Sequence, residues 1–463
     1  MAEPQATFLS GSLFGHVAVM SLTSTVGLMA VFLVDFIDMV FISMLGQAEL
    51  AAAVGYAGAI LFFTTSFSIG MAIAVGALVA RALGAGQAEA ARVRASNGLV
   101  YGVILGAGFA AFVWANIPLF VRWIGADGET AALAEGYLRI IVPSLPFLVV
   151  GMMGSGVLRA YGDARRAMMA TIYGGGVNAV LDPILIFGLG LDHTGAALET
   201  VAARVEIACA AILPILRHHG GLPRPDLAGL VADFRPLVTI GIPAILTQLA
   251  TPVGQAIVTR SMAQYGLEAV AGMAIVGRLM PVSFAVVFAL SGAVGPIIGQ
   301  NYGARDFDRV RAGFNAALRF AGMVVVVISV VLFVLRGPIA DLFDATGLAR
   351  DLVFLFCGPL ALLFFFNGVL FVANAAFNNL GHPFYSTWMN WGRNTVAMIP
   401  LVSLGAWAYG APGVLVGQAL SGVVFGLVAW ALALRTIARG GEDAPRDKFD
   451  REGRLLSLLN LRK

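Results

Sequence analysis

The chain has 463 residues, of which 59% are hydrophobic and only 12% charged, and its formal net charge is +3. Mean hydropathy is +0.87, which excludes an ordinary soluble domain and indicates a polytopic membrane protein with no nucleic-acid partner. The apolar stretches are about 20–30 residues long, which favours membrane-spanning helices over the short alternating strands of a barrel.

Twelve such stretches follow one another along the chain, so we predict an all-α integral membrane protein with twelve transmembrane helices. Cys209 and Cys357 lie inside two of them, with no spacing that suggests a disulfide or a metal site. No cofactor is therefore expected. The expected spans cover residues 17–45, 49–80, 96–120, 133–157, 167–190, 195–216, 236–264, 268–299, 312–335, 351–377, 384–408 and 413–434.

The two halves of the chain resemble each other. The segment that starts at Gly76 resembles the one that starts at Gly295, and LRAYGDARR around Gly162 matches FNNLGHPFY around Gly381. Both pairs have the same separation in the sequence (295 − 76 = 219 and 381 − 162 = 219). Two six-helix bundles related by a parallel repeat, with a V-shaped cleft between them, are therefore expected. We predict an N-terminal lobe over 1–216, a cytoplasmic linker over 217–235, a C-terminal lobe over 236–437 and a cytoplasmic tail over 438–463.

Arginine placement predicts the orientation. The even-numbered junctions between spans hold twelve arginines, from Arg81 to Arg311, whereas the opposite side holds only Arg122, Arg336 and Arg350. Because positive residues stay on the cytoplasmic side, both termini are expected in the cytoplasm. Arginine outnumbers lysine 27 to 2, as in GC-rich prokaryotes, so a multi-pass protein of a prokaryotic inner membrane is expected.

The first span contains two acids, Asp35 and Asp38, on one helix face. Two neighbouring carboxylates do not both ionise cheaply, so one is expected to hold a proton near neutral pH. In the alternative interpretation, Asp35 lies near the helix entrance and is simply solvated.

A second polar group lies in the fifth span. Asn178 and Asp182 are four residues apart on one face, and Pro183 removes the hydrogen bond to the carbonyl of Ala179. A carboxylate inside a span costs roughly 2.5–3.5 kcal/mol, so such acids often mark an ion or proton path. The alternative is a proline kink with Asn178 and Asp182 packed against neighbouring helices. We predict a coupling role for Asn178 and Asp182 and a helix bend at Pro183.

Further polar side chains accompany these groups. Thr200 in the sixth span supplies a hydroxyl that serves either the coupling site or its own helix carbonyl. Glu199 beside it either adds negative charge to a cavity or pairs with Arg204. The second half offers neutral hydrogen-bonding groups that are candidates to line a cleft, namely Gln248, Gln255, Asn374 and Asn378.

These motifs resemble the multidrug and toxic compound extrusion (MATE) family. The resemblance rests on DMVFISMLGQAELAAAVG (38–55), LRAYGD (158–163), NAVLDPILIFGLGLDHTGAALET (178–200) and GPIIGQNYGA (295–304). Agreement is best with the DinF-type branch, which implies coupling acids in spans one and five, at Asp38 and Asp182, with Asn178 and Thr200 nearby. If Na+ is the coupling ion, these four residues are its expected ligands.

We therefore expect an antiporter that exports bulky organic compounds, often cationic or amphiphilic, in exchange for H+ or Na+. Its expected partners are small-molecule substrates and membrane lipids, and a monomer is expected. One alternative is a lipid-linked saccharide flippase of the same superfamily, which would need a basic cleft. Another is a membrane-embedded enzyme, which the five scattered histidines do not favour.

Overall fold

The first bundle contains six membrane crossings. The computed structural model describes residues 5–44 and 48–440, and of residues 35, 38–44, 48 and 51 it describes the backbone only. The crossings are α1 (Leu13–Met44), α2 (Ala48–Gly84), α3 (Ala88–Ala115), α5 (Gly128–Ile141) with η1 (Val142–Ser144) and α6 (Leu145–Ala160), α7 (Ala164–Pro183) with the π-helical turn η2 (Ile184–Gly188), and α8 (Asp192–His218). A short helix, α4 (Ile117–Trp123), connects α3 to α5.

The second bundle repeats this arrangement. Its crossings are α9 (Leu227–Ala263), α10 (Leu267–Ser283) with α11 (Ala285–Gly303), α12 (Phe307–Leu342), α13 (Gly347–Leu355) with η3 (Phe356–Leu360), α14 (Ala361–Leu363) and α15 (Phe365–Asn379), and finally α16 (Pro383–Trp391) with η4 (Gly392–Ala397) and α17 (Met398–Arg439). Helix α9 already begins at Leu227, so the second part of the expected 217–235 linker is helical.

Twelve crossings follow from length, hydropathy and two local features. Nine helices of the described chain are long and apolar enough to cross a membrane, and the bent pair within 347–379 makes ten. The segment Pro383–Arg439 has 57 residues and crosses twice, because Gly410 reverses it with φ 66° and ψ −141°. The twelfth crossing is α8, whose charged side chains lower its hydropathy. The predicted all-α fold with twelve transmembrane helices is confirmed.

The chain reversal at Gly410 needs glycine on both of its arms. A Cβ on Gly405 would lie 2.0 Å from the carbonyl oxygen of Gly413, and a Cβ on Gly413 would lie 1.9 Å from that of Gly405. The two arms can therefore approach so closely only without side chains.

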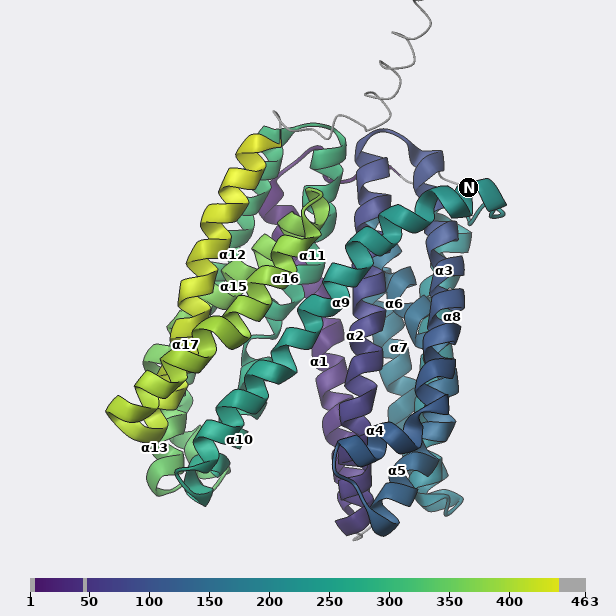
Figure 1. Ribbon diagram of the computed structural model, residues 1–463. Helices are drawn as coiled ribbons and strands as arrows, with labels where there is room; N and C mark the ends of the chain where they lie inside the picture. The colour runs from purple at the N-terminus through teal and green to yellow at the C-terminus, as the bar shows by residue number, and fades with distance from the viewer. Residues whose placement is uncertain (1–4, 45–47, 441–463) are drawn as a thin grey trace, which may run out of the picture.

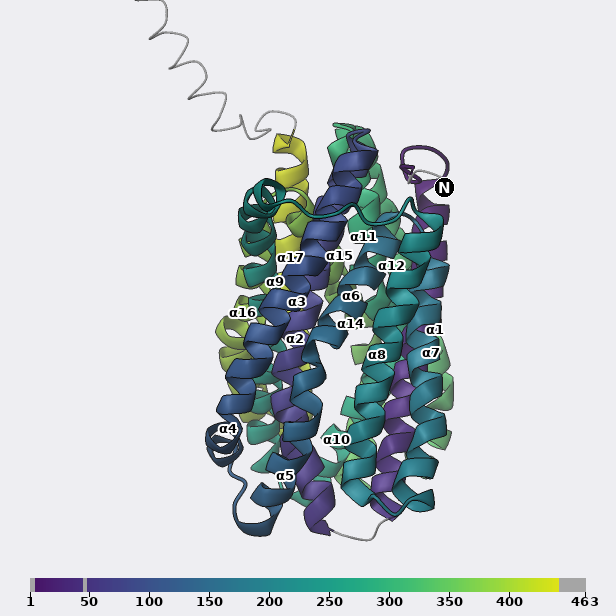
Figure 2. The same cartoon turned by 90° about the vertical axis from the view of Figure 1, so that its right-hand side faces the viewer.

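The two bundles form a V, which confirms the predicted shape. Figure 1 shows them meeting at the end where α2, α9 and α11 come together and separating toward the ends of α4, α5, α10 and α13. The quarter-turned view in Figure 2 shows the long helices running side by side between these two ends.

The closed end of the V coincides with the arginine-rich junctions. Here α2 and α11 touch through glycine: a Cβ on Gly84 would lie 1.8 Å from the carbonyl oxygen of Gln300, and one on Gly303 would lie 2.1 Å from that of Arg81. Arg81 also donates from Nη2 to the carbonyl of Asn378 at 2.6 Å, which links the first bundle to the second.

The N-terminal segment is built into the same contact. The amide of Phe8 donates to Oε1 of Gln300 at 2.8 Å, and Nε2 of Gln300 donates to the carbonyl of Ala160 at 2.8 Å. Gln300 is 0% exposed. A single buried amide therefore satisfies backbone groups from two other segments, which would be costly to leave unpaired.

A substitution at the α2–α11 contact should open the closed end. In Gly84→Ala the new Cβ must move away from the carbonyl of Gln300, so we expect the helices to separate there by about 2 Å or more to restore ordinary contact. Spin labels at Glu89 and Asp308, in a chain without Cys209 and Cys357, would measure the change. Gly136→Ala is the control, because its Cβ meets nothing within 4 Å. An unchanged label distance in Gly84→Ala would contradict this view of the contact.

Asp163 joins two ends of the first bundle. Its carboxylate accepts the amide of Arg166 at 3.2 Å, at the start of α7, and lies 3.0 Å from Nε2 of His219, just after α8. Burial alone would raise the pKa of Asp163, but the hydrogen bonds from His219 and Arg166 outweigh it and lower the pKa to about 2.

This lowered pKa makes stability depend on pH. Because the folded-state pKa lies below the ordinary value of 3.8, the carboxylate contributes fully above that value and the contribution disappears as pH falls toward 2. We expect Asp163→Asn to cost about 1–2 kcal/mol at neutral pH. Melting temperatures of both proteins in detergent should differ most above pH 4 and converge below it; a constant difference would speak against an ionic origin.

Candidate functional site

The fifth crossing carries a buried polar pair. Asn178 is 7% exposed and Asp182 is 1% exposed, one turn apart on α7. On the next helix, α8, Glu199 is also only 1% exposed. Burying carboxylates at this depth is expensive unless a proton, a cation or a counter-charge compensates them.

Small residues bring α7 and α8 into close contact around these acids. A Cβ on Gly174 would lie 2.2 Å from Cγ1 of Ile207, and a Cβ on Gly195 would lie 2.9 Å from the carbonyl oxygen of Leu185. The helices are antiparallel, so these two contacts fix their register. Asp182 lies between Gly174 and Leu185 on α7, and Glu199 lies between Gly195 and Ile207 on α8. The register therefore puts Asp182 and Glu199 at one level. The sequence offered Glu199 as a cavity residue or as a partner of Arg204; the helix register places it at the level of Asp182.

Thr200 contacts the buried acids through the carboxylate of Glu199. Its hydroxyl lies 3.0 Å from the carbonyl oxygen of Ala196 and 3.3 Å from Oε2 of Glu199. The hydroxyl can bond its own helix or the neighbouring carboxylate, and the coupling role of Thr200 stays a prediction.

A buried arginine provides positive charge nearby. Arg204 is 7% exposed, and its Nη1 donates to the carbonyl of Ile141 at 3.2 Å and to Oγ of Ser144 at 3.1 Å. The charge of Glu199 acts on Arg204 electrostatically. Arg204 is held by neutral oxygens of the α5–η1 segment, which keeps its charge in place independently of the state of Glu199.

The backbone of α1 passes the same level. Gly27 faces Met168, and Gly175 faces Val34. Because the residue numbers differ equally at both contacts (168 − 27 = 141 and 175 − 34 = 141), α1 and α7 run in parallel with one constant register. This register brings the α1 turn at residue 38 to the level of residue 179. The side chains of Asp35 and Asp38 lie outside the described residues, so their coupling roles stay predictions.

A change of helix type follows Pro183. Pro183 keeps helical angles, with φ −63° and ψ −30°, and the π-helical turn η2 starts at the next residue. In this turn Leu189 N donates to the carbonyl of Ile184 at 2.9 Å, five residues back. Proline lacks the donor that an α-helix needs at this position, and π-turns are frequent at functional sites. Whether the helix bends here during transport remains a prediction.

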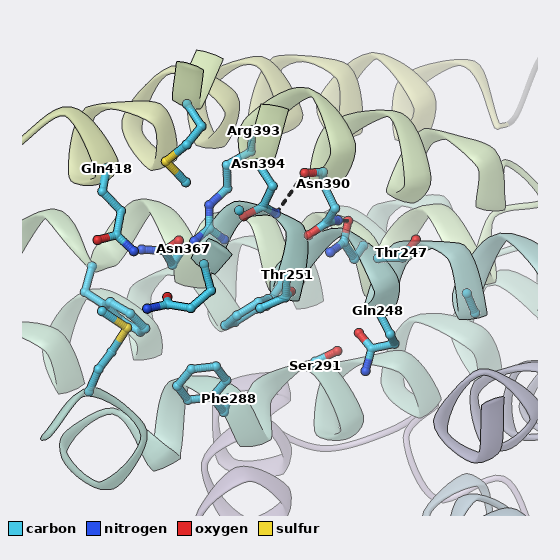
Figure 3. Close-up of a pocket in the computed structure, with 18 of the residues that line it drawn as sticks. Thr247, Gln248, Thr251, Phe288, Ser291, Asn367, Asn390, Arg393, Asn394 and Gln418 are labelled. Carbon is cyan, nitrogen blue, oxygen red and sulfur yellow. Dashed lines mark hydrogen bonds between the residues drawn. The ribbon is translucent and has the colours of Figure 1, made fainter. Parts of the chain in front are cut away.

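The second bundle contains a cavity of about 330 Å³ on the side that faces α2. This volume lies within the range of small-molecule sites. All four neutral residues expected from the sequence line it: Gln248, Gln255, Asn374 and Asn378. Figure 3 shows this cavity with Gln248 on one side and Gln418 on the other.

Hydrogen bonds hold the amides of the cavity wall in place. Nδ2 of Asn390 donates to Oδ1 of Asn374 at 3.1 Å, Oγ of Ser386 donates to Oδ1 of Asn378 at 3.2 Å, and Nδ2 of Asn394 donates to the carbonyl of Asn390 at 2.9 Å. These bonds fix the direction of the remaining donors and acceptors, so the wall is pre-organised for polar recognition.

Arg393 is the functional candidate that the sequence analysis missed. It lies in the π-helical turn η4 and lines the cavity. Figure 3 shows its side chain between Gln418 and Asn394, extending into the pocket. The sequence does contain a signal for Arg393, because it is a charged residue inside the expected apolar span 384–408, where burying a charge is costly.

Family comparison identifies this architecture. The MatE family model matches residues 24–184 and 243–404. The chain belongs to the MATE family. The two matches start as far apart as the sequence repeats do (243 − 24 = 219), so each bundle carries one copy of the MATE module.

Two curated relatives of this MATE protein are named as a transporter and an export protein. A protein of Shewanella oneidensis named FAD transporter is 29% identical over 423 residues, covering 90% of this chain and 93% of its own length. The multidrug export protein MepA of Staphylococcus aureus is 25% identical over 332 residues, covering 70% of this chain and 72% of its own. The alternative of a membrane-embedded enzyme is therefore not supported.

Solved MATE structures share the fold. A multidrug resistance MATE family transporter in an outward-facing conformation superposes with a TM-score of 0.87 at 22% identity, covering 96% of this chain and all of the other. A transporter of the same superfamily from Pyrococcus furiosus gives a TM-score of 0.87 at 22% identity, covering 95% of this chain and 99% of its own.

Proposed function

We propose that this MATE transporter is an antiporter of the prokaryotic inner membrane that exports organic compounds in exchange for H+ or Na+. The coupling ion binds in the first bundle and the transported compound in the cavity of the second. The observation that carries the proposal is the pair of acids, Asp182 and Glu199, each 1% exposed and at one level of two tightly packed helices.

The physical argument concerns charge. Two carboxylates at one level of a low-dielectric bundle repel each other, so their ionisation is coupled and they favour holding a proton or sharing a cation. Arg204 offsets part of the negative charge, and a proton or a cation can balance the rest. Asp38 and Asn178 are further proposed ligands, with Thr200 reaching the group through Glu199.

Coupling follows from the shape change that neutralisation permits. When a proton or Na+ enters from the open side and neutralises Asp182 or Glu199, α7 and α8 no longer carry repelling charges and can repack. The η2 turn after Pro183 is the segment of α7 best suited to absorb this change. A proton that crosses 100 mV supplies about 2.3 kcal/mol for the export step.

Orientation is part of the proposal. The closed end of the V carries the arginine-rich junctions, which the distribution of positive charge assigns to the cytoplasm. The structure would then be open to the outside, the state in which the coupling ion enters and the exported compound leaves. Both termini would face the cytoplasm, and the protein would act as a monomer.

The acids can be tested separately in proteoliposomes that hold the purified protein and a fluorescent dye. We expect Asp182→Asn and Glu199→Gln each to reduce gradient-driven dye export about tenfold or more, because neither variant can exchange the coupling charge. Imposing a pH gradient and a Na+ gradient in separate runs identifies the ion. Asp351→Asn is the matched control, since Asp351 is an exposed acid on α13.

Near-normal coupled export by both acid variants would remove the proposed site. Normal export by Glu199→Gln alone would restrict coupling to Asp182 and its neighbours on α7 and α1. Equal export with and without a gradient in the wild-type protein would remove antiport itself.

A further inference from the structure

The cavity of the second bundle has an unusual charge. Among the described residues that line it there is one arginine, Arg393, and no aspartate or glutamate. The other polar groups are amides and hydroxyls, which carry no net charge. The cavity is therefore positive, whereas the acids of the first bundle are not part of its lining.

Arg393 has no counter-charge of its own. Within the described chain it forms no ion pair and no hydrogen bond, and its Nε is shielded from solvent without a partner. A guanidinium group offers five donors and stays charged, so a half-buried and unpaired one is costly to keep. An anionic ligand would satisfy these donors, ideally through a paired contact with a carboxylate or phosphate.

The backbone around Arg393 aims the side chain into the cavity. The residue lies in a π-helical turn, and such turns recur at functional sites. The ring of Phe425 packs against its neighbour Gly392, where a Cβ would lie only 2.2 Å from the ring. On the facing helix, Gly254 packs against Asn394, whose Oδ1 would lie 2.3 Å from a Cβ. Both contacts hold the turn in place on either side of the arginine.

The rest of the wall suits a flat ring. Phe288, Phe364 and Phe371 line the cavity, with the Phe288 and Phe371 rings 5.3 Å apart and the Phe288 and Phe364 rings 5.8 Å apart. Aromatic side chains grouped in this way offer faces and edges for stacking. The amides of Asn367 and Gln418 lie beside Arg393 in Figure 3 and can bond the polar edge of such a ring.

We propose that the second-bundle cavity binds planar organic anions, with Arg393 pairing with the anionic group, the amides bonding the ring edge and the phenylalanines contacting the ring face. This proposal rests on the transport function above and replaces the expected preference for cationic compounds. The acids of the first bundle would then serve the coupling ion alone.

The test uses two dyes that share one ring system and differ in charge: anionic fluorescein and a cationic rhodamine ester. Both carry a planar xanthene ring, so the comparison isolates the charge. With wild-type protein in proteoliposomes we expect fluorescein to be exported at least tenfold more efficiently, as kcat/KM, than the rhodamine. In Arg393→Gln the KM for fluorescein should rise about tenfold to a hundredfold through loss of the charged contact, and Arg393→Lys should restore part of it.

Controls separate the two proposals. Arg260→Gln removes an exposed arginine from the same lobe, at the end of α9, and should export fluorescein normally. If Arg393→Gln does not fold, fluorescence polarisation of each dye with detergent-purified wild type decides instead, and tighter binding of fluorescein supports the proposal. Preferential export or binding of the rhodamine overturns the anion site while leaving antiport intact; failure to move either dye under any gradient overturns the transport proposal itself.

Discussion

The backbone contact between α2 and α11 is the constraint that sets how the two bundles meet at the closed end. Gly84 and Gly303 allow the two helices to meet backbone to backbone, each against a carbonyl of the other. Such a contact lacks long side chains that could adapt, so it fixes the distance between α2 and α11 at this end. Contacts of α2 with α9, at Gly70 and Ile245, and of α1 with α11 also hold the bundles together, and beyond them the bundles separate to form the V.

The repeat gives the two bundles one architecture, but their buried charged side chains lie at different positions of the repeat. At the offset of the repeat, Asp182 in the first bundle corresponds to Leu401 in the second (182 + 219 = 401), and Arg393 in the second corresponds to Gly174 in the first (393 − 219 = 174). Gly174 serves the packing of α7 on α8, whereas Arg393 projects into a cavity. Different positions of one helical template thus carry the buried acid in one bundle and the cavity arginine in the other.

Sequence patterns predicted the fold more completely than the site. Hydropathy indicated twelve crossings, and the internal repeat indicated two bundles, because both signals extend over many residues. Asn178 and Asp182 were found because an acid in an apolar run is conspicuous. The position of Glu199 opposite Asp182 could not be predicted from the sequence, because it depends on the helix register that Gly174 and Gly195 set. The direction of the Arg393 side chain likewise depends on the π-helical turn η4, which hydrophobic periodicity does not predict.

The acids of α7 and α8 lie apart from the cavity, which limits how the proposed transport can be coupled. In a shared site, a proton and a substrate would compete for the same carboxylate, and exchange would follow from that competition. Here the cavity is lined by helices of the second bundle together with Phe62 and Ile73 of α2, and by none of the acids on α7 and α8. If the coupling ion binds at these acids as proposed, it acts on the cavity indirectly, through the helices that connect the two places. Helix α2 belongs to the first bundle, lines the cavity of the second and forms the closed end with α11, so it is the element through which the two binding events would communicate.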